Sequence, residues 1–156
     1  MSFSSLFAYP TENSPDAIVN QPFLAHWTHS QWQKLLALTQ TYRYSAGDWV
    51  IRQRATDRAL YLVAFGRLEV LGTKEGKANQ RLAVIEAGHI VGEQSFLDGH
   101  AQPLDVRAIT EADSVRISLE AFEIFAAREP TLARDLALAT GRVVSLRLRT
   151  VTGTGD

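Results

Sequence analysis

The sequence predicts a mainly β fold, a double-stranded β-helix or jelly roll, with a helical element before it and helices after it in the sequence. Short apolar segments with period-two alternation follow one another closely between about residues 42 and 118, and glycines separate them. Helical spacing of apolar residues is found before and after this region. Strands do not alternate with helices, which argues against a parallel α/β sheet.

Length and composition favour one globular domain. The chain has 156 residues, of which 46% are apolar and 21% charged, and its net charge is −1. This balance argues against nucleic acid or an anionic membrane as a partner. There is no cysteine and no apolar run of the ~18 residues that a membrane span needs. We therefore expect a cytoplasmic protein.

Two parts of the chain are expected to differ in order. Residues 1–16 are rich in Ser, Thr, Asn and Pro but carry several aromatics, so they form either a disordered arm or a strap packed on the body. Residues 17–156 are expected to be the single domain. No helix-turn-helix for DNA binding is expected after the last predicted helix.

An N-terminal helix is predicted to begin near Thr28, and residues 17–25 could add a helical piece before it. Thr28 and Gln31 have the spacing of a capping box, and Trp27 can pack on Trp32 as a hydrophobic staple. The face expected to lie against the sheet is formed by Trp32, Leu35, Leu36 and Thr39.

The strands predicted by period-two alternation then follow in order. A turn at 46–48 separates the first two, and a charged loop with glycines is expected over 72–80. The predicted strands are 42–44, 49–53, 59–64, 67–71, 81–85, 90–91, 106–109 and 115–118.

Two helices are predicted over about residues 119–151, with Ser118 as N-cap of the first and Pro130 opening the second. The second carries an apolar stripe at spacings of three and four: Leu132, Leu136, Ala139, Val143 and Leu146. The stripe could pair two subunits or pack on the chain's own roll, and we favour a homodimer. The basic residues beside it are expected to face solvent: Arg142, Arg147 and Arg149.

The most informative segment lies between Gly88 and Ala108. A two-residue strand ends at Gly92, a single helical turn follows and closes at Gly99, and Pro103 breaks the chain before the next strand. A glycine at position 92 lets the backbone approach a bound group closely, and free N–H groups at a helix start favour an anion.

This segment resembles the phosphate-binding cassette of the cyclic-nucleotide-binding domain family, which forms the sensor of catabolite-activator-type regulators. The matching motifs are Val91-Gly92-Glu93, Leu97-Asp98-Gly99 and Val106, and the likeness extends over about residues 27–148. The resemblance implies a regulatory or sensory module rather than an enzyme. It also implies a cyclic nucleotide ligand and a long C-terminal helix that dimerises and closes over that ligand.

The segment departs from the family where the phosphate is bound. Gln102 stands in place of the family's arginine, and Pro103 in place of a residue that donates its backbone N–H. Glutamine offers only neutral amide donors, and proline has no N–H. Losing two charge-assisted hydrogen bonds costs roughly 3–6 kcal/mol, so we expect no cyclic nucleotide binding of the usual kind.

Glu93 can still accept a hydrogen bond from a ribose hydroxyl, so three outcomes stay open. The site could bind a cyclic nucleotide or another small anion weakly, hold a different ligand, or serve protein contacts. The candidate site residues are Gly92, Glu93, Gln94, Gln102, Pro103 and Leu104.

Other chemistry is weakly supported. His100 or Arg107 could replace the missing cation, although a strand would turn Arg107 to solvent if Val106 faces inward. His26 and His29 lack a third metal ligand nearby. A cupin-like metal enzyme would need a His-x-His motif, which is absent from the sequence, so we expect neither a metal site nor catalytic residues.

Overall fold

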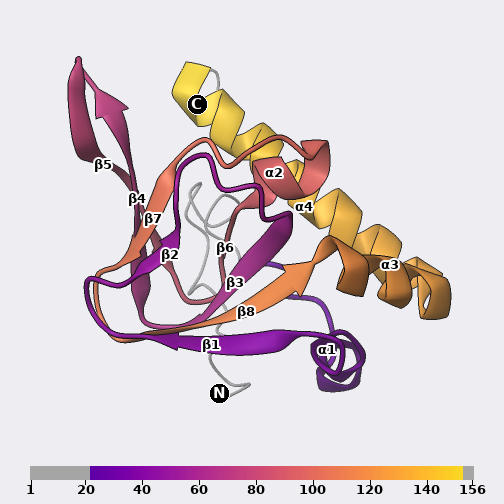
Figure 1. The fold of residues 1–156 in the computed structure, drawn as a ribbon. Helices are drawn as coiled ribbons and strands as arrows, with labels where there is room; N and C mark the ends of the chain where they lie inside the picture. The colour runs from indigo at the N-terminus through magenta and orange to yellow at the C-terminus, as the bar shows by residue number, and fades with distance from the viewer. Residues whose placement is uncertain (1–21, 153–156) are drawn as a thin grey trace, which may run out of the picture.

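The computed structural model describes residues 22–152, which form two four-stranded antiparallel sheets with helices along one side (Figure 1). The first sheet has the order β1 (Gln40–Tyr44), β8 (Ala112–Ser118), β3 (Ala59–Phe65) and β6 (Ile90–Val91). The second has the order β2 (Trp49–Ile51), β7 (Asp105–Ala108), β4 (Arg67–Lys74) and β5 (Lys77–Glu86). The predicted jelly roll is confirmed.

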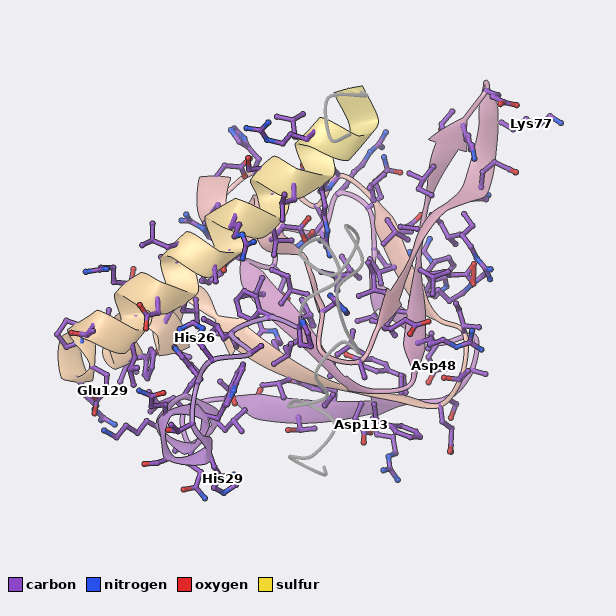
Figure 2. The ribbon with its side chains drawn as sticks, turned by 180° about the vertical axis from the view of Figure 1, so that it is seen from behind. His26, His29, Asp48, Lys77, Asp113 and Glu129 are labelled. Carbon is purple, nitrogen blue, oxygen red and sulfur yellow. The ribbon has the colours of Figure 1, made fainter. Side chains whose placement is uncertain are left out.

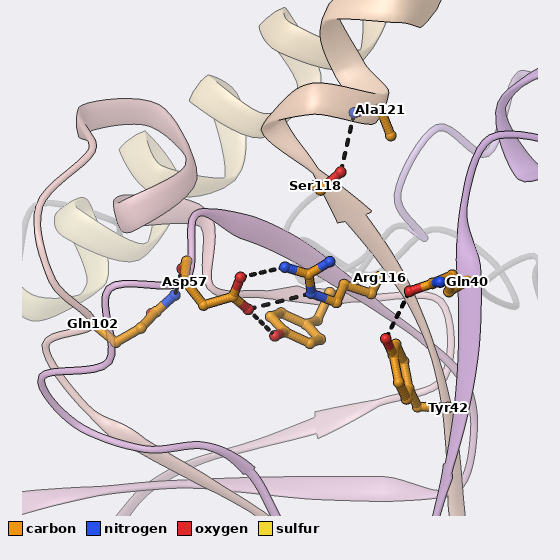
Figure 3. Close-up of polar contacts among 8 residues, drawn as sticks. Gln40, Tyr42, Asp57, Gln102, Arg116, Ser118 and Ala121 are labelled. Atoms are coloured by element: carbon orange, nitrogen blue, oxygen red, sulfur yellow. Dashed lines mark hydrogen bonds and ion pairs between the residues drawn. The ribbon is translucent and has the colours of Figure 1, made fainter.

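Four helices are described: α1 (His29–Leu36), α2 (Glu93–Asp98), α3 (Leu119–Arg128) and α4 (Pro130–Thr152). The predicted capping box is present, because Gln31 N–H donates to Thr28 Oγ1 at 3.2 Å and Thr28 N–H donates to Gln31 Oε1 at 2.9 Å. Trp27 packs edge-on against Trp32, with 5.1 Å between ring centroids. The Ser118 hydroxyl accepts from Ala121 N–H at 3.0 Å and caps α3, as predicted (Figure 3).

Two apolar cores result from the alternation of side chains along β3 and β8, because neighbours on a strand point to opposite faces. One core lies between the sheets and includes Ile51, Tyr61, Val63, Leu68, Val91 and Val106. The other lies between the first sheet and the helices and includes Trp32, Leu60, Leu62, Ile117, Phe125 and Leu136. Strand β3 is therefore buried on both faces.

The predicted loop over 72–80 is wrong. Strand β4 continues to Lys74, β5 begins at Lys77, and Glu75 and Gly76 form the hairpin turn with φ of 53° and 75°. The hairpin projects from the body, with Lys77 at its tip (Figure 2). Charged residues are compatible with these strands because β5 forms the exposed edge of its sheet.

The helical piece proposed for 17–25 is not found in its described part. Residues 23–26 form a turn in which Ala25 N–H donates to the Pro22 carbonyl at 3.2 Å, and Phe23 N–H donates to Gly88 O at 2.7 Å. The turn places Phe23 and Leu24 in the helix-side core. The arm over 1–16 lies outside the described residues.

The apolar stripe of α4 faces the chain's own roll. Leu132 is 7% exposed and Leu136 is fully buried, so the prediction that these two contact a second subunit is wrong. Further along the helix, Ala139 and Val143 are partly buried against the same core, and Leu146 is half-buried. The helix packs there because the first sheet offers it an apolar face. Within residues 22–152, no helix has both the length and the apolar character of a membrane span.

Candidate functional site: a cleft beneath helix α4

A small cleft lies where β6 and α2 approach the loop before β7 and the C-terminal part of α4. All six residues that the sequence singled out line it: Gly92, Glu93, Gln94, Gln102, Pro103 and Leu104. The remaining lining residues are Val70, Val91, Val106 and Arg147. The cleft has a volume of about 50 Å³, which is room for a few water molecules. Typical ligand pockets hold roughly 300–1,000 Å³, so a nucleotide needs this cleft to widen.

Gly92 joins β6 to α2 in a left-handed conformation, with φ of 80°. A Cβ atom added there would lie 2.9 Å from the Ala59 carbonyl oxygen and 3.2 Å from the Tyr61 ring. Glycine is required here for a close approach to the neighbouring strand β3. The turn places Glu93 in the first turn of α2, where its side chain is buried against the cleft.

Glu93 is paired with an arginine from a distant part of the chain. Arg147 Nη1 on α4 lies 2.8 Å from Glu93 Oε1, and Arg147 Nη2 donates to the Ile90 carbonyl oxygen at 2.6 Å. The prediction that Arg147 faces solvent is therefore wrong. Positions 136, 140, 143 and 147 recur at helical spacing, so Arg147 lies on the same face of α4 as the buried Leu136. The spacing of these positions in the sequence could have predicted that Arg147 lies on the buried face of α4.

Gln102 stabilises the part of the cleft that the loop before β7 forms. It is 4% exposed, and its side-chain amide donates to the Asp57 carbonyl oxygen at 3.3 Å. Its backbone N–H donates to the Ala55 carbonyl oxygen at 2.9 Å, and its carbonyl oxygen accepts from the Arg54 N–H at 2.8 Å. Pro103 beside it is exposed and has no N–H to offer. Neither residue brings a positive charge to this wall.

An ion-pair network fixes the segment on which Gln102 rests (Figure 3). Arg116 on β8 donates from Nε to the Asp57 carboxylate at 3.2 Å, and its Nη2 pairs with the same carboxylate. The Tyr61 hydroxyl also donates to the Asp57 carboxylate, at 2.5 Å. Burial alone would raise the pKa of Asp57, but the hydrogen bonds from Arg116 and Tyr61 outweigh it and the pKa is lowered. Burial and the hydrogen bond to Asp57 raise the pKa of Tyr61.

Helix α2 is anchored at both ends by arginines. Arg58 donates to the carbonyl oxygens of Phe96 and Leu97, at 3.0 and 3.1 Å, where α2 ends. Arg147 holds its first residue through Glu93. His89 lies close to Arg147, and burial, followed by the charge of that arginine, lowers the pKa of its imidazole. The cassette is thus tied to α4 by a charged contact.

The alternative cations do not line the cleft. His100 is exposed, and its backbone N–H donates to Asp98 Oδ1 at 2.8 Å. Arg107 pairs with Glu69 at 3.4 Å and lies over the Trp49 ring, 5.3 Å from its centroid. Among the residues that the structure describes, no three or more His, Cys, Asp or Glu side chains gather in a way that could hold a metal.

Known proteins resemble this chain in sequence and in fold. The model of the cyclic nucleotide-binding domain family matches residues 41–129. The cyclic AMP receptor protein of Thermus thermophilus is 28% identical over 107 residues, which cover 69% of this chain and 50% of that protein. The chain spans half or less of the length of each curated relative it matches.

Two solved structures share the fold. A cyclic nucleotide-binding domain from Methylobacillus flagellatus aligns with a TM-score of 0.77 and 21% identity, covering 95% of this chain and 79% of that one. The catabolite activator protein of Thermus thermophilus aligns with a TM-score of 0.70 and 24% identity, covering 85% and 63%. At these identities the likeness establishes the architecture.

Proposed function

This chain belongs to the cyclic nucleotide-binding domain family, and we propose that it is a regulatory module that captures cyclic nucleotide only weakly. Its output is the position of helix α4, which covers the cleft formed by the cassette. A ligand shifts the population of helix positions to the extent that it binds them with different affinities. The module has no catalytic role in this proposal.

The observation that carries the proposal is the uncharged wall formed by Gln102 and Pro103. The Gln102 amide is committed to the Asp57 carbonyl, and Pro103 cannot donate. A phosphate placed at this wall therefore lacks two donors, which corresponds to roughly 3–6 kcal/mol, or about two to four decades of affinity. The small volume of the cleft adds the cost of widening it.

Calorimetric titration with cAMP and cGMP tests this proposal directly. We expect dissociation constants near the millimolar range for the whole chain, against the micromolar range of an intact site. Saturable binding below about 10 µM would contradict weak capture. A gain-of-binding variant sharpens the test: Gln102→Arg with Pro103→Ser should tighten binding by about two decades. Pro103→Ser alone serves as the matched control.

A second part of the proposal concerns self-association through the outer face of α4. Leu138 and Leu148 are 63% and 61% exposed, and a Cβ added at Gly141 would meet no atom within 4 Å. With Ser145 they recur at spacings of three, four and three, the pattern of a coiled-coil seam, which argues for a second copy of the same helix as occupant. Sedimentation should show a dimer that Leu138→Glu dissociates. A monomer at all concentrations would contradict it.

A further inference from the structure

We propose that Arg147 is the anion-binding cation of the cleft and replaces only part of the donors lost at positions 102 and 103. The inference rests on the proposed function only in that the ligand enters this cleft. The ligand class is a phosphate oxyanion, either free phosphate or the phosphate of a cyclic nucleotide. The guanidinium then comes from α4 rather than from the loop that carries Gln102.

The charges around the cleft support this assignment. Within the described part of the chain, Arg147 is the only cationic side chain among the lining residues, and Glu93 is the only anionic one. The cleft thus holds one charge of each sign, and the positive one is contributed by a helix about forty-five positions after Gln102 in the sequence. A search confined to the cassette misses it.

The geometry leaves Arg147 able to accept a ligand. A guanidinium has five N–H donors in a planar fork. The contacts to Glu93 Oε1 and Ile90 O use one donor each on Nη1 and Nη2. The side chain lines the cleft and is 35% exposed, so protein encloses it only in part. The two existing contacts orient the guanidinium, and an oxyanion can accept from the donors that remain.

A direct consequence is that ligand charge acts on α4 without an intermediary. An anion near Arg147 competes with Glu93 for the same guanidinium and is repelled by the Glu93 carboxylate. Binding therefore changes the contact that ties α4 to the cassette. Removing the carboxylate should free the guanidinium for the anion, so Glu93→Gln is expected to tighten binding of inorganic phosphate. Inorganic phosphate is the probe because it has no ribose hydroxyl that could donate a hydrogen bond to Glu93.

The experiment uses the whole chain, titrated at low ionic strength with inorganic phosphate, cAMP and, as the uncharged control, adenosine, and followed by NMR chemical shifts. We compare Arg147→Gln with Arg142→Gln, an exposed arginine on the same helix. Arg147→Gln should weaken binding of both phosphate probes at least about tenfold, Arg142→Gln should leave it unchanged, and Arg147→Lys should fall between. Binding by phosphate alone identifies a free oxyanion ligand, and stronger binding by cAMP identifies a nucleotide. If Arg147→Gln does not fold, the Arg147→Lys and Glu93→Gln variants decide the matter by the direction of their effects.

The outcomes separate this inference from the proposed function. Weak cAMP binding that Arg147→Gln leaves unchanged overturns the role of Arg147 and leaves the weak-capture proposal standing. Tight cAMP binding that Arg147→Gln abolishes supports the role of Arg147 and overturns the weak-capture proposal. If neither phosphate nor cAMP binds up to about 10 mM, Arg147 is not an anion site. Adenosine binding as strongly as cAMP would also overturn the inference, because the phosphate would then contribute nothing.

Discussion

The two halves of helix α4 are held to the molecule by different forces. Residues 130–140 contribute Leu132, Ala133 and Leu136 to the helix-side core, each 7% exposed or less. Residues 141–152 contribute the polar contacts of Arg147 to Glu93 and to the Ile90 carbonyl. The first half is therefore held by full apolar burial, whereas the second half combines the partial burial of Val143 and Leu146 with a charged contact that depends on geometry.

The difference indicates which half can respond to a ligand. Displacing the first half would expose fully buried side chains such as Leu136, at a cost comparable to a large part of a domain's stability. Displacing the second half breaks the contacts of Arg147 and exposes side chains that are only partly buried, such as Val143 and Leu146, so it costs less. We therefore infer that the first half is structural and the second half is the moving part, with Gly141 between them.

The largest expected effect is on the first half. Leu136→Ala removes a fully buried side chain packed among Trp32 and Phe125, so the free energy of unfolding should fall by about 2–5 kcal/mol. Urea denaturation measures the change. Leu97→Ala, at a leucine 41% exposed on α2, is the control and should stay within about 0.5 kcal/mol. A small loss for Leu136→Ala would contradict the distinction between the two halves.

Breaking the charged contact should affect the second half alone. Arg147→Gln removes the partner of the buried Glu93, and we expect the free energy of local opening to fall by about 1–3 kcal/mol. Amide hydrogen exchange should accelerate over 141–152 and stay unchanged over 130–140. Uniform acceleration along the whole helix would show that α4 moves as one unit.

The junction offers a smaller and opposite effect. Gly141 lies in the helix interior, and a Cβ added there meets no atom within 4 Å. Gly141→Ala should therefore stabilise α4 by about 0.5–1 kcal/mol through helix propensity, and slow hydrogen exchange over 141–152. A destabilised variant would indicate that the helix needs glycine at this position for a conformation outside the one described.

The smallest effect is a titration next to the ion pair. Burial and then the charge of Arg147 lower the pKa of His89 below its ordinary value of 6.5, while Glu86 opposes them. Because the folded pKa is depressed, the stability contribution of neutral His89 is present above the unfolded pKa and is lost as the pH falls through the folded pKa.

Arg147→Gln should raise the pKa of His89 toward its ordinary value and so reduce this loss of stability in acid. NMR titration of the imidazole measures the shift, with Arg142→Gln as the control. An unchanged pKa would mean that burial alone controls His89. The lowered pKa of Asp57 has the same sign, so its contribution is also lost as the pH falls, at still lower pH.

Sequence alone determined what depends on local patterns. Period-two alternation identified most strands, the Thr28 cap and the Ser118 cap marked two helix starts, and the glycine before Glu93 marked the turn of the cassette. The motifs of that cassette were enough to indicate the family. The charged hairpin at 72–80 was missed because exposed edge strands lack a buried face to impose alternation.

Tertiary structure alone decided which charges meet. Glu93 and Arg147 are far apart in the sequence, and only the packing of α4 on the roll brings them together in one cleft. The same packing reserves Leu132 and Leu136 for the protomer's own core and leaves Leu138 outside. The physical reason is that an apolar stripe at helical spacing can pack on any apolar face. Which face it packs on depends on the three-dimensional arrangement of the sheets.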